Sequence, residues 1–352
     1  MNEKLQISIQ NGKAYAHSLS QIVQTPADGS ADQRYFYASP TDAIRQQQFN
    51  PNDSWFGTDW GKVVTLLHFS DIHGDATELI RIVDYLNTLP SSVVPLFTGD
   101  MVRYDWADGI GFWENIQGTN KILVAIGNHD VQSGKTATDC YTRYLAPNIA
   151  SWGVTYQSNL CYYYKDWASI GVRLIVLDCM HWDATQQSWL VATLASAKTA
   201  GYHVVVANHY ATADAPINRN CSFDTPHSGV WDKINSAAPN AVQDFIDGGG
   251  HFVAWLCGHT HADMLRFPAN YPQQLYYAVA NASTPTNGGA TATCQLERVN
   301  GRKSQDLFNL ITINPIQQTF TIVRVGANHD TIGRHIGSVV YDYANHQILW
   351  ND

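Results

Sequence analysis

The middle of the chain carries short apolar runs, and most of them end in a cluster of polar residues. Runs of this length are typical of buried strands. Two longer stretches, residues 76–89 and 185–200, carry apolar side chains at helical spacing instead, and a shorter helix is predicted over 240–247 before three glycines. Strands thus alternate with helices, which predicts an α/β fold. The strand-like runs cover residues 63–69, 93–97, 121–126, 172–177, 201–207 and 251–256.

The two ends of the chain follow a different pattern. Residues 1–60 are polar and rich in predicted loops, with room for one hairpin. From about residue 274 the apolar runs become mostly strand-like, and residues 314–318 form the predicted turn of a hairpin. We therefore predict an N-terminal extension, one main domain, and a tail that packs on that domain. Their predicted ranges are 1–60, 61–326 and 327–352.

Five polar clusters follow these apolar runs, where chemistry is expected. In open α/β sheets, ligands bind outside the carboxyl ends of the strands. Every side chain in the clusters that could bind a metal offers a nitrogen or oxygen donor, and none offers a thiolate. Such a set of donors suits Zn, Mn or Fe. The clusters are Asp71-x-His73, Gly99-Asp100, Gly127-Asn128-His129-Asp130, Asn208-His209 and Gly258-His259-Thr260-His261.

The spacing within the clusters has a physical reason. Residues two apart on an extended segment point to the same side, so Asp71 and His73 can reach one ion. His259 and His261 either do the same or diverge to different ions. A carboxylate such as Asp100 can bridge two cations, and ions ~3.5–4 Å apart can clamp both oxygens of a phosphoryl displacement. Glycines beside the clusters let the backbone turn sharply there.

The sequence strings SDIHG, TGD, GNHD, NHY and GHTH occur in this order between about Val63 and Ala262. In this respect the chain resembles the calcineurin-like metallophosphoesterases, and residues 185–200 lie where such proteins carry a helix. The resemblance implies a four-layer α/β/β/α sandwich of two mixed β-sheets flanked by helices, with the site at one edge. Residues 275–325 would complete the second sheet.

The resemblance also implies a role for each site residue. Asp71, His73 and His261 would hold one metal ion, and Asn128, His209 and His259 the other. Asp100 would bridge the two ions, which would be Mn, Fe or Zn. His129 would either protonate the leaving oxygen or stabilise charge on the phosphoryl group, and a metal-bound hydroxide would be the nucleophile.

One position departs from the family pattern. Many relatives have an acidic residue three positions after the bridging Asp, where it can orient the catalytic His. Here that position is Arg103, and Asp105 is a candidate substitute. Arg103 either contacts substrate phosphate, which a guanidinium group suits, or forms a structural salt bridge. Asp130 is either a loop carboxylate or a partner of a metal ligand.

Several residues have simpler interpretations. Asn328-His329-Asp330 repeats the letters NHD of the third cluster, but it lies outside the expected motif order, so Asn128 and His129 are favoured. His68 lies within an apolar run and is predicted to be a core histidine. The loops that would choose a substrate are predicted over about 101–120, 131–170 and 210–240.

Composition narrows the classes of partner. The net charge of -9 argues against nonspecific binding to nucleic acid, but bound metals would still permit a phosphorylated small molecule or nucleotide. The 6 cysteines form no C-x-x-C pair, and buried thiols are the simplest interpretation, although Cys140 and Cys161 could close a short disulfide loop. No run is long enough for a membrane span, and the polar N-terminus lacks a signal peptide, so we expect a cytoplasmic protein or one exported after removal of a leader.

The sequence thus predicts metal-dependent hydrolysis of a phosphoester. The GNHD and GHTH forms resemble those of cyclic-nucleotide and glycerophosphodiester phosphodiesterases, so a phosphodiester is slightly preferred. A phosphomonoesterase or nucleotidase using the same site is the alternative. Two further alternatives are a metal-retaining, non-catalytic surface or virion protein and a metal-dependent hydrolase of another bond. The oligomeric state stays open.

Overall fold

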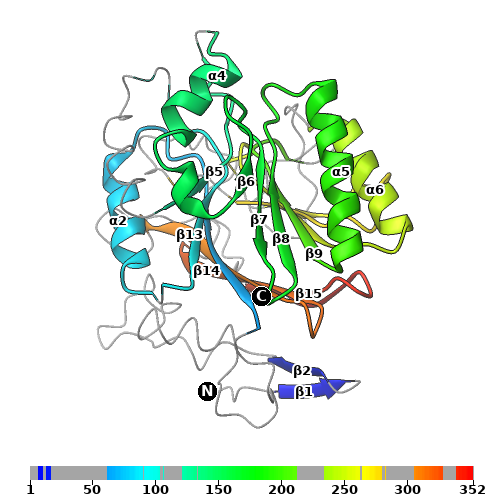
Figure 1. Cartoon of the computed structure of the whole chain (residues 1–352). Coiled ribbons are helices and arrows are strands. Elements are labelled where there is room, and N and C mark those ends of the chain that lie inside the picture. Colours follow the sequence, from blue (N-terminus) through cyan, green and yellow to red (C-terminus); the bar gives the residue numbers. More distant parts are fainter. Residues whose placement is uncertain are drawn as a thin grey trace, which may run out of the picture.

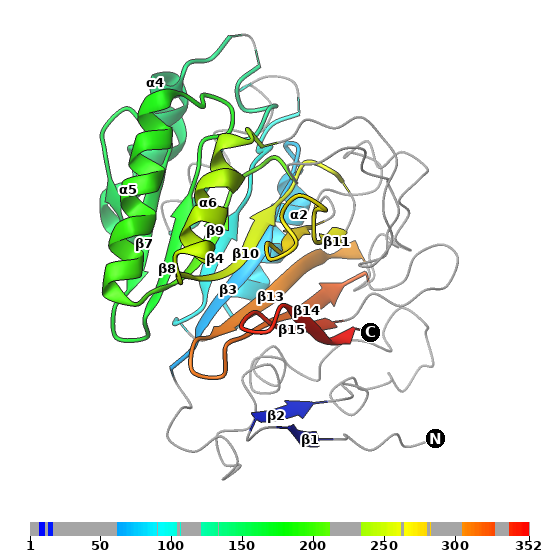
Figure 2. The same cartoon turned by 90° about the vertical axis from the view of Figure 1, so that its right-hand side faces the viewer.

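Two mixed β-sheets lie face to face, and helices cover their outer faces (Figure 1). This arrangement confirms the predicted four-layer sandwich. The turned view shows α5 and α6 side by side over one sheet, with the strands of the other sheet behind them (Figure 2). The computed structural model describes residues 7–10, 13–16, 62–89, 91–103, 106, 121–132, 134–211, 234–261, 264–279, 282, 305–327 and 338–351.

The first sheet has the strand order β16-β15-β14-β13-β3-β4-β5. Strands β3, β4 and β5 run parallel, and β13 pairs antiparallel with β3 to join them to the C-terminal meander. The bounds are β3 Val64–Phe69, β4 Val94–Phe97, β5 Leu123–Val124, β13 Leu307–Asn314, β14 Thr319–Gly326, β15 Ser338–Asp342 and β16 Gln347–Asn351.

The second sheet has the strand order β11-β12-β10-β9-β8-β7-β6. Strands β8, β9, β10 and β12 run parallel, whereas β6, β7 and β11 pair antiparallel with their neighbours. The bounds are β6 Thr155–Tyr156, β7 Tyr163–Trp167, β8 Val172–Val176, β9 His203–Ala207, β10 His251–Cys257, β11 Met264–Arg266 and β12 Tyr276–Ala278.

Helix α2 lies on one side of the two sheets, and α5 and α6 lie on the other (Figure 1). The Asp75 side chain caps α2 by accepting from the backbone N–H groups of Thr77 and Glu78. Helix α5 ends at Gly201, whose φ of 71° suits glycine. The helical bounds are α2 Ala76–Leu86, α4 Ala137–Cys140, η3 Tyr141–Leu145, η4 Ile149–Trp152, α5 Ala184–Ala200 and α6 Ala237–Asp247.

The central position of β9 in the second sheet explains why its sequence is apolar from Val204 to Ala207 and does not alternate. Val204 and Val206 belong to the cluster under α5 and α6, which includes Leu190 and Val242. Val205 and Ala207 belong to the cluster that fills the space between the sheets. Because successive side chains point to opposite faces and both faces are covered, every position must be apolar.

Two predictions about particular segments were wrong. Residues 275–325 do not stay in the second sheet, because β12 joins that sheet while β13 and β14 join the first. An apolar run records burial but not which sheet buries it. Residues 131–170 are not a plain loop, since they contain α4, η3, η4, β6 and β7.

The chain ends lie partly outside the described residues. Strands β1 (Ile7–Gln10) and β2 (Lys13–Ala16) pair antiparallel, and the other residues of 1–60 are not described. Strands β15 and β16 extend the first sheet through β14. The boundaries of the extension and the tail stay predictions.

Two further expectations concern cysteines and membrane spans. Cys140, Cys161 and Cys257 are buried free thiols, and Cys179 is a half-buried one, so Cys140 and Cys161 form no disulfide. Among the described residues, no helix combines the length and the hydrophobicity that crossing a membrane requires.

Candidate metal centre

The loops that follow β3, β4, β9 and β10 are joined by backbone hydrogen bonds. Asp71 N–H donates to the Gly99 carbonyl over 2.9 Å, and His73 N–H donates to the Asp100 carbonyl over 3.1 Å. Gly258 N–H donates to the His209 carbonyl over 3.0 Å. Between the sheets, His259 N–H donates to Asp71 Oδ2 over 3.0 Å, so loops from both sheets meet at one edge of the sandwich and present their polar side chains there.

Five of the predicted metal ligands have left-handed backbone conformations. For residues other than glycine this conformation is uncommon, though Asp and His adopt it more readily than most. Strained conformations of this kind concentrate at functional sites, where the surrounding structure holds them. The φ angles are 55° for Asp71, 49° for His73, 64° for Asp100, 68° for His259 and 53° for His261.

Two glycines permit the close approach of these loops. A Cβ on Gly127 would overlap the backbone nitrogen and side chain of Asp100. A Cβ on Gly258 would overlap the side chains of Ser70 and Asp71. Glycine is therefore required at both positions by the packing of the loops against the carboxylates.

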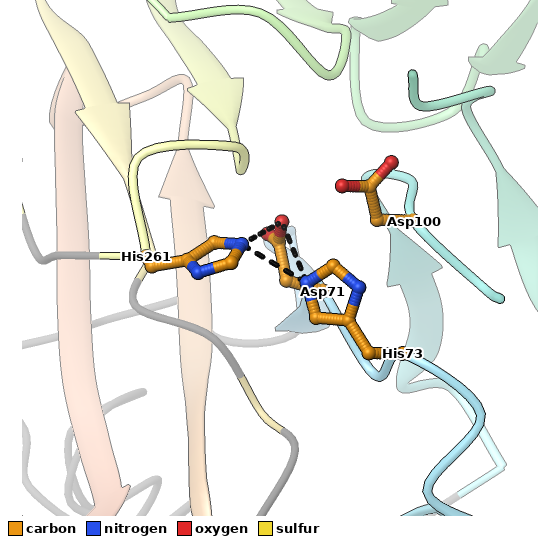
Figure 3. Close-up of side chains that lie close together, drawn as sticks. All are labelled: Asp71, His73, Asp100 and His261. Carbon is orange, nitrogen blue, oxygen red and sulfur yellow. Dashed lines mark hydrogen bonds and ion pairs between the residues drawn. The ribbon is translucent and has the colours of Figure 1, made fainter. Parts of the chain in front are cut away.

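The first group of ligand atoms comes from Asp71, His73 and His261, with Asp100 beside them (Figure 3). The Nε2 atoms of His73 and His261 lie 2.9 Å apart. Asp71 Oδ1 is 3.3 Å from the Nε2 of His261 and 3.8 Å from that of His73. Asp71 Oδ1 and His73 Nδ1 are buried and lack a hydrogen-bond partner of good geometry among the described residues. Such convergence of acceptor atoms fits a cation between them.

The second group comes from Asp100, His209 and His259, which are all buried. His209 Nδ1 lies 2.7 Å from the Thr98 carbonyl, which can only accept, so Nδ1 carries the proton. In the neutral ring, Nε2 then presents its lone pair 3.3 Å from Asp100 Oδ2 and 3.0 Å from Asn128 Oδ1. Asp100 belongs to both groups, and within each group the ligand atoms lie within 4.8 Å of one another.

Burial and neighbouring charges set the protonation of the cluster in the absence of metal. Burial alone would raise the pKa values of Asp71 and Asp100, but the surrounding histidines hold both below the usual range. Burial lowers the pKa of His73 to about 4 and that of His259 to about 3. For His209 burial also acts downward, but Asp100 raises the pKa to about 9. The ionised carboxylates and the neutral rings of His73 and His259 are in the forms that bind cations, whereas His209 must lose a proton before it can bind one.

Asp130 organises the loops instead of facing the ligand atoms. Its Oδ2 accepts from the backbone N–H groups of Asp100 over 3.0 Å and Gly127 over 2.8 Å. Its Oδ1 accepts from Met101 N–H over 2.8 Å and from the Tyr144 hydroxyl over 3.3 Å. Burial, followed by the charge of Asp100, raises the pKa of Asp130 to about 6. Of the two readings left open by the sequence, a loop carboxylate that supports Asp100 matches these contacts.

His129 lies at the side of the cluster, with 24% of its side chain exposed. Its backbone N–H donates to Asp100 Oδ1 over 2.8 Å, and its Nε2 is 3.8 Å from Asp100 Oδ2. Its ring centroid is 4.8 Å from that of His73. The other ring nitrogen, Nδ1, contacts the backbone carbonyl of Arg103 and lies 2.9 Å from Gln132 Nε2.

The remaining expectations divide as follows. All eight predicted metal and catalytic residues meet at one edge, from Asp71 through His261. Arg103 meets His129 through its backbone, and a contact between its side chain and phosphate stays a prediction. Asp105 and Asn328-His329-Asp330 lie outside the described residues. His68 is a core histidine as predicted, with Nε2 3.0 Å from the Thr98 hydroxyl.

The sequence did not single out Gln132 or Tyr210 as site residues. The Tyr210 ring packs 4.8 Å from that of His259 and 5.9 Å from that of His209, so it forms a wall of the second group. Its place directly after His209 was the available signal. Gln132 carries no such signal, because it lies outside the GNHD string and outside every other cluster.

Comparisons with known proteins agree with this geometry. The sequence model of a family described as calcineurin-like phosphoesterase matches residues 64–263. A dimetal phosphatase from zebrafish (Danio rerio) shares the fold with a TM-score of 0.51 at 12% identity, over 80% of this chain and 99% of that one. A purple acid phosphatase from yellow lupin (Lupinus luteus) seeds has a TM-score of 0.47 at 12% identity, over 79% and 53% of the two chains. No curated protein sequence matches the chain.

Proposed function

Because the chain belongs to the calcineurin-like phosphoesterase family, we propose that it hydrolyses a phosphodiester at a centre of two metal ions. The family depends on a dinuclear metal centre, and this chain has candidate ligand groups for one. The observation that carries the proposal is that two groups of ligand atoms share a single buried carboxylate, Asp100. A shared carboxylate can bridge two cations, one on each oxygen.

The ligands divide between the two ions. Asp71, His73 and His261 would hold one ion, since their facing atoms lie within 3.8 Å of Asp71 Oδ1 or of each other. His209, His259 and Asn128 would hold the other, and the Thr98 carbonyl fixes the His209 ring so that Nε2 faces Asn128 Oδ1 and Asp100 Oδ2. When bound, such ions lower the pKa of a water molecule and polarise phosphoryl oxygens. Mn, Fe and Zn suit this mixture of nitrogen and oxygen donors.

His129 supplies the acid. Its Nε2 faces Asp100 at 3.8 Å, beside the ligand groups and not within them, and its side chain is partly open to solvent. Protonated at Nε2, it donates this proton to the leaving oxygen as the ester bond breaks. Asp130 fixes the loops that carry Asp100 and His129, because its carboxylate accepts from the backbone N–H groups of Asp100, Met101 and Gly127.

The preference for a diester rests on the GNHD and GHTH strings. The substrate is then a phosphorylated small molecule or nucleotide with an ester group on both sides of the phosphorus. A phosphomonoester at the same centre is the second candidate. It would use the same ligands, so only the relative rates on the two ester types distinguish them.

The test is hydrolysis of bis(4-nitrophenyl) phosphate beside 4-nitrophenyl phosphate, with Mn, Fe, Zn, Co or Ni supplied. We expect faster turnover of the diester. His129→Ala should keep its metals and lose ~10²–10⁴-fold in kcat on a diester with an alkyl leaving group, and less on the nitrophenyl esters, whose leaving group needs little acid. Asn128→Ala should lose activity together with metal. His251→Ala, an exposed histidine outside both groups, is the matched control and should change neither.

Faster turnover of the monoester would replace the diester by the second candidate. Protein that holds about two metals but hydrolyses neither ester would contradict the catalytic proposal and favour a metal-retaining, non-catalytic protein. Loss of the activity in His251→Ala as large as that in His129→Ala would contradict the site.

A further inference from the structure

The His129 ring is held on the side that faces away from the ligand groups. Its Nδ1 contacts the backbone carbonyl of Arg103. Arg103 stands at the position where many relatives carry an acidic residue. The Gln132 amide nitrogen lies 2.9 Å from the same Nδ1 and 3.5 Å from the Arg103 carbonyl. Two polar groups therefore meet at one ring nitrogen.

The protons at this meeting point can be assigned. The Arg103 carbonyl only accepts, so the close contact requires a proton on Nδ1. A protonated Nδ1 cannot also accept from the Gln132 amide nitrogen. Rotation of the amide by 180° exchanges its oxygen and nitrogen, which occupy the same envelope and are assigned from the hydrogen-bond network. In that orientation Gln132 Oε1 and the Arg103 carbonyl both accept from Nδ1–H.

We infer that Gln132 is a positioning residue for His129 and replaces the acidic side chain that this chain lacks at position 103. The inference rests on the proposed function, in which His129 protonates the leaving oxygen. Two neutral acceptors on Nδ1–H fix both the tautomer and the rotation of the ring. They aim Nε2 at the cluster, 3.8 Å from Asp100 Oδ2.

The backbone around Gln132 is fixed well enough for this task. Trp106 Nε1 donates to the Asp130 carbonyl over 2.8 Å, between His129 and Gln132 in the chain. Asp130 N–H donates to the Gly127 carbonyl over 3.1 Å. Gln132 therefore follows a turn that these hydrogen bonds hold in place, so its side chain starts close to the His129 ring.

The chemical step shows where the loss of Gln132 would be felt. Water attacks phosphorus, and the bond to the leaving oxygen breaks with its electron pair on that oxygen. The oxygen takes the proton from His129 Nε2, while the proton lost by water passes to solvent, from which His129 recovers one. A leaving group that is a weak base, such as 4-nitrophenolate, needs little of this help. A strongly basic alkoxide needs all of it.

The kinetic test compares leaving groups in the metal-loaded full chain. Esters with 4-nitrophenyl, phenyl and methyl leaving groups are hydrolysed by the wild type, Gln132→Leu, Gln132→Glu and His129→Ala. In Gln132→Leu we expect kcat to fall ~10-fold or more with phenyl and methyl leaving groups but about 2-fold with 4-nitrophenyl, as for lost general acid catalysis. KM and metal content should not change, and Gln132→Glu should restore the slow substrates. Gln187→Leu, on the exposed face of α5, is the matched control.

A second measurement needs no turnover. In protein labelled with ¹⁵N-histidine, the Nδ1–H proton of His129 is assigned by its absence in His129→Gln. We expect this proton to be protected from solvent in the wild type and to exchange about tenfold faster in Gln132→Leu, the effect of losing one hydrogen bond. Circular dichroism of each variant, with Gln132→Asn as a smaller change, separates this result from unfolding.

The outcomes separate the two proposals. A leaving-group effect in His129→Ala without one in Gln132→Leu overturns the role of Gln132 alone. The absence of that effect in both variants overturns the acid role of His129 and with it the inference. If the wild type hydrolyses no ester, the exchange measurement decides, and an unprotected Nδ1–H or an unchanged rate in Gln132→Leu overturns the inference.

Discussion

Strands β9 and β10 carry a pair of histidines at each end, and the two pairs differ in their neighbours. His203 and His251 begin the strands, directly opposite each other in register, with their rings stacked 4.5 Å apart. His209 and His259 follow the strands, with their rings 5.0 Å apart. Ring spacing is therefore nearly the same at both ends of the second sheet.

The neighbours of each pair make the difference. At the first end, the Tyr343 hydroxyl lies 2.8 Å from His203 Nδ1, and burial followed by the charge of His251 lowers the pKa of His203 to about 4. At the other end, Asp100 raises the pKa of His209 to about 9 against the effect of burial. No candidate metal group within the described residues includes His203 or His251. Within the described residues, adjacent histidines of these two strands thus join a candidate metal group only where a carboxylate meets them.

The largest expected effect comes from removing the shared carboxylate. Asp100→Ala should release both metals and lower activity by about 10³-fold or more, because residues that act as a unit lose nearly all function together. Metal content by mass spectrometry and kcat are the measurements. His203→Ala, at the other end of β9, should keep both metals. Equal loss of metal in the two variants would contradict the difference between the ends.

Asp130→Asn tests whether the geometry of the loops, as well as the charge of Asp100, distinguishes the end of β9 and β10 that carries His209 and His259 from the other end. The amide cannot accept from all the backbone donors that now surround the carboxylate, so at least one buried N–H loses its partner. We expect a loss of about 3 kcal/mol in the free energy of unfolding, measured in urea, together with weaker metal binding. Full stability with normal metal content would show that the loops hold without this carboxylate.

Gly258→Ala changes the space beside Asp71 without changing any charge. The added methyl group would overlap the side chains of Ser70 and Asp71, so we expect a loss of about 2 kcal/mol and displaced ligands. Gly201→Ala is the matched control, because nothing lies within 4 Å there and only its φ of 71° opposes alanine. The control should cost about 1 kcal/mol and leave metal binding unchanged. Loss of metal in Gly201→Ala would contradict a specific role of Gly258 at the site.

The smallest expected effect concerns the other end of the sheet. His203 has a pKa of about 4 in the folded chain against 6.5 in a model peptide. Between these two pH values the unfolded chain binds a proton at this residue and the folded chain does not. Stability therefore falls as pH drops from about 6.5 toward 4. Because solvent partly screens this group, we expect a loss of about 1 kcal/mol from this residue between pH 7.5 and 5. Urea unfolding at both pH values should show it, and His203→Gln should show it less; an equal loss in the variant would rule out this source.

The sequence by itself determined the local elements and the places where chemistry is concentrated. Helical spacing over 185–200 and apolar runs over 64–69 and 251–256 reflect burial of one or both faces, which is a property of each segment alone. The ordered clusters from Asp71 to His261 determined the family, because the identity and order of donor side chains are written in the chain.

Only the tertiary structure decided how these pieces meet. It placed β13 beside β3 although more than 200 residues separate them. It also assigned Asp130 to backbone N–H groups and His129 to the Arg103 carbonyl and Gln132. These contacts use main-chain atoms and distances between loops, which every residue type shares. They leave no mark on the pattern of side chains along the chain, so no reading of the sequence alone could supply them.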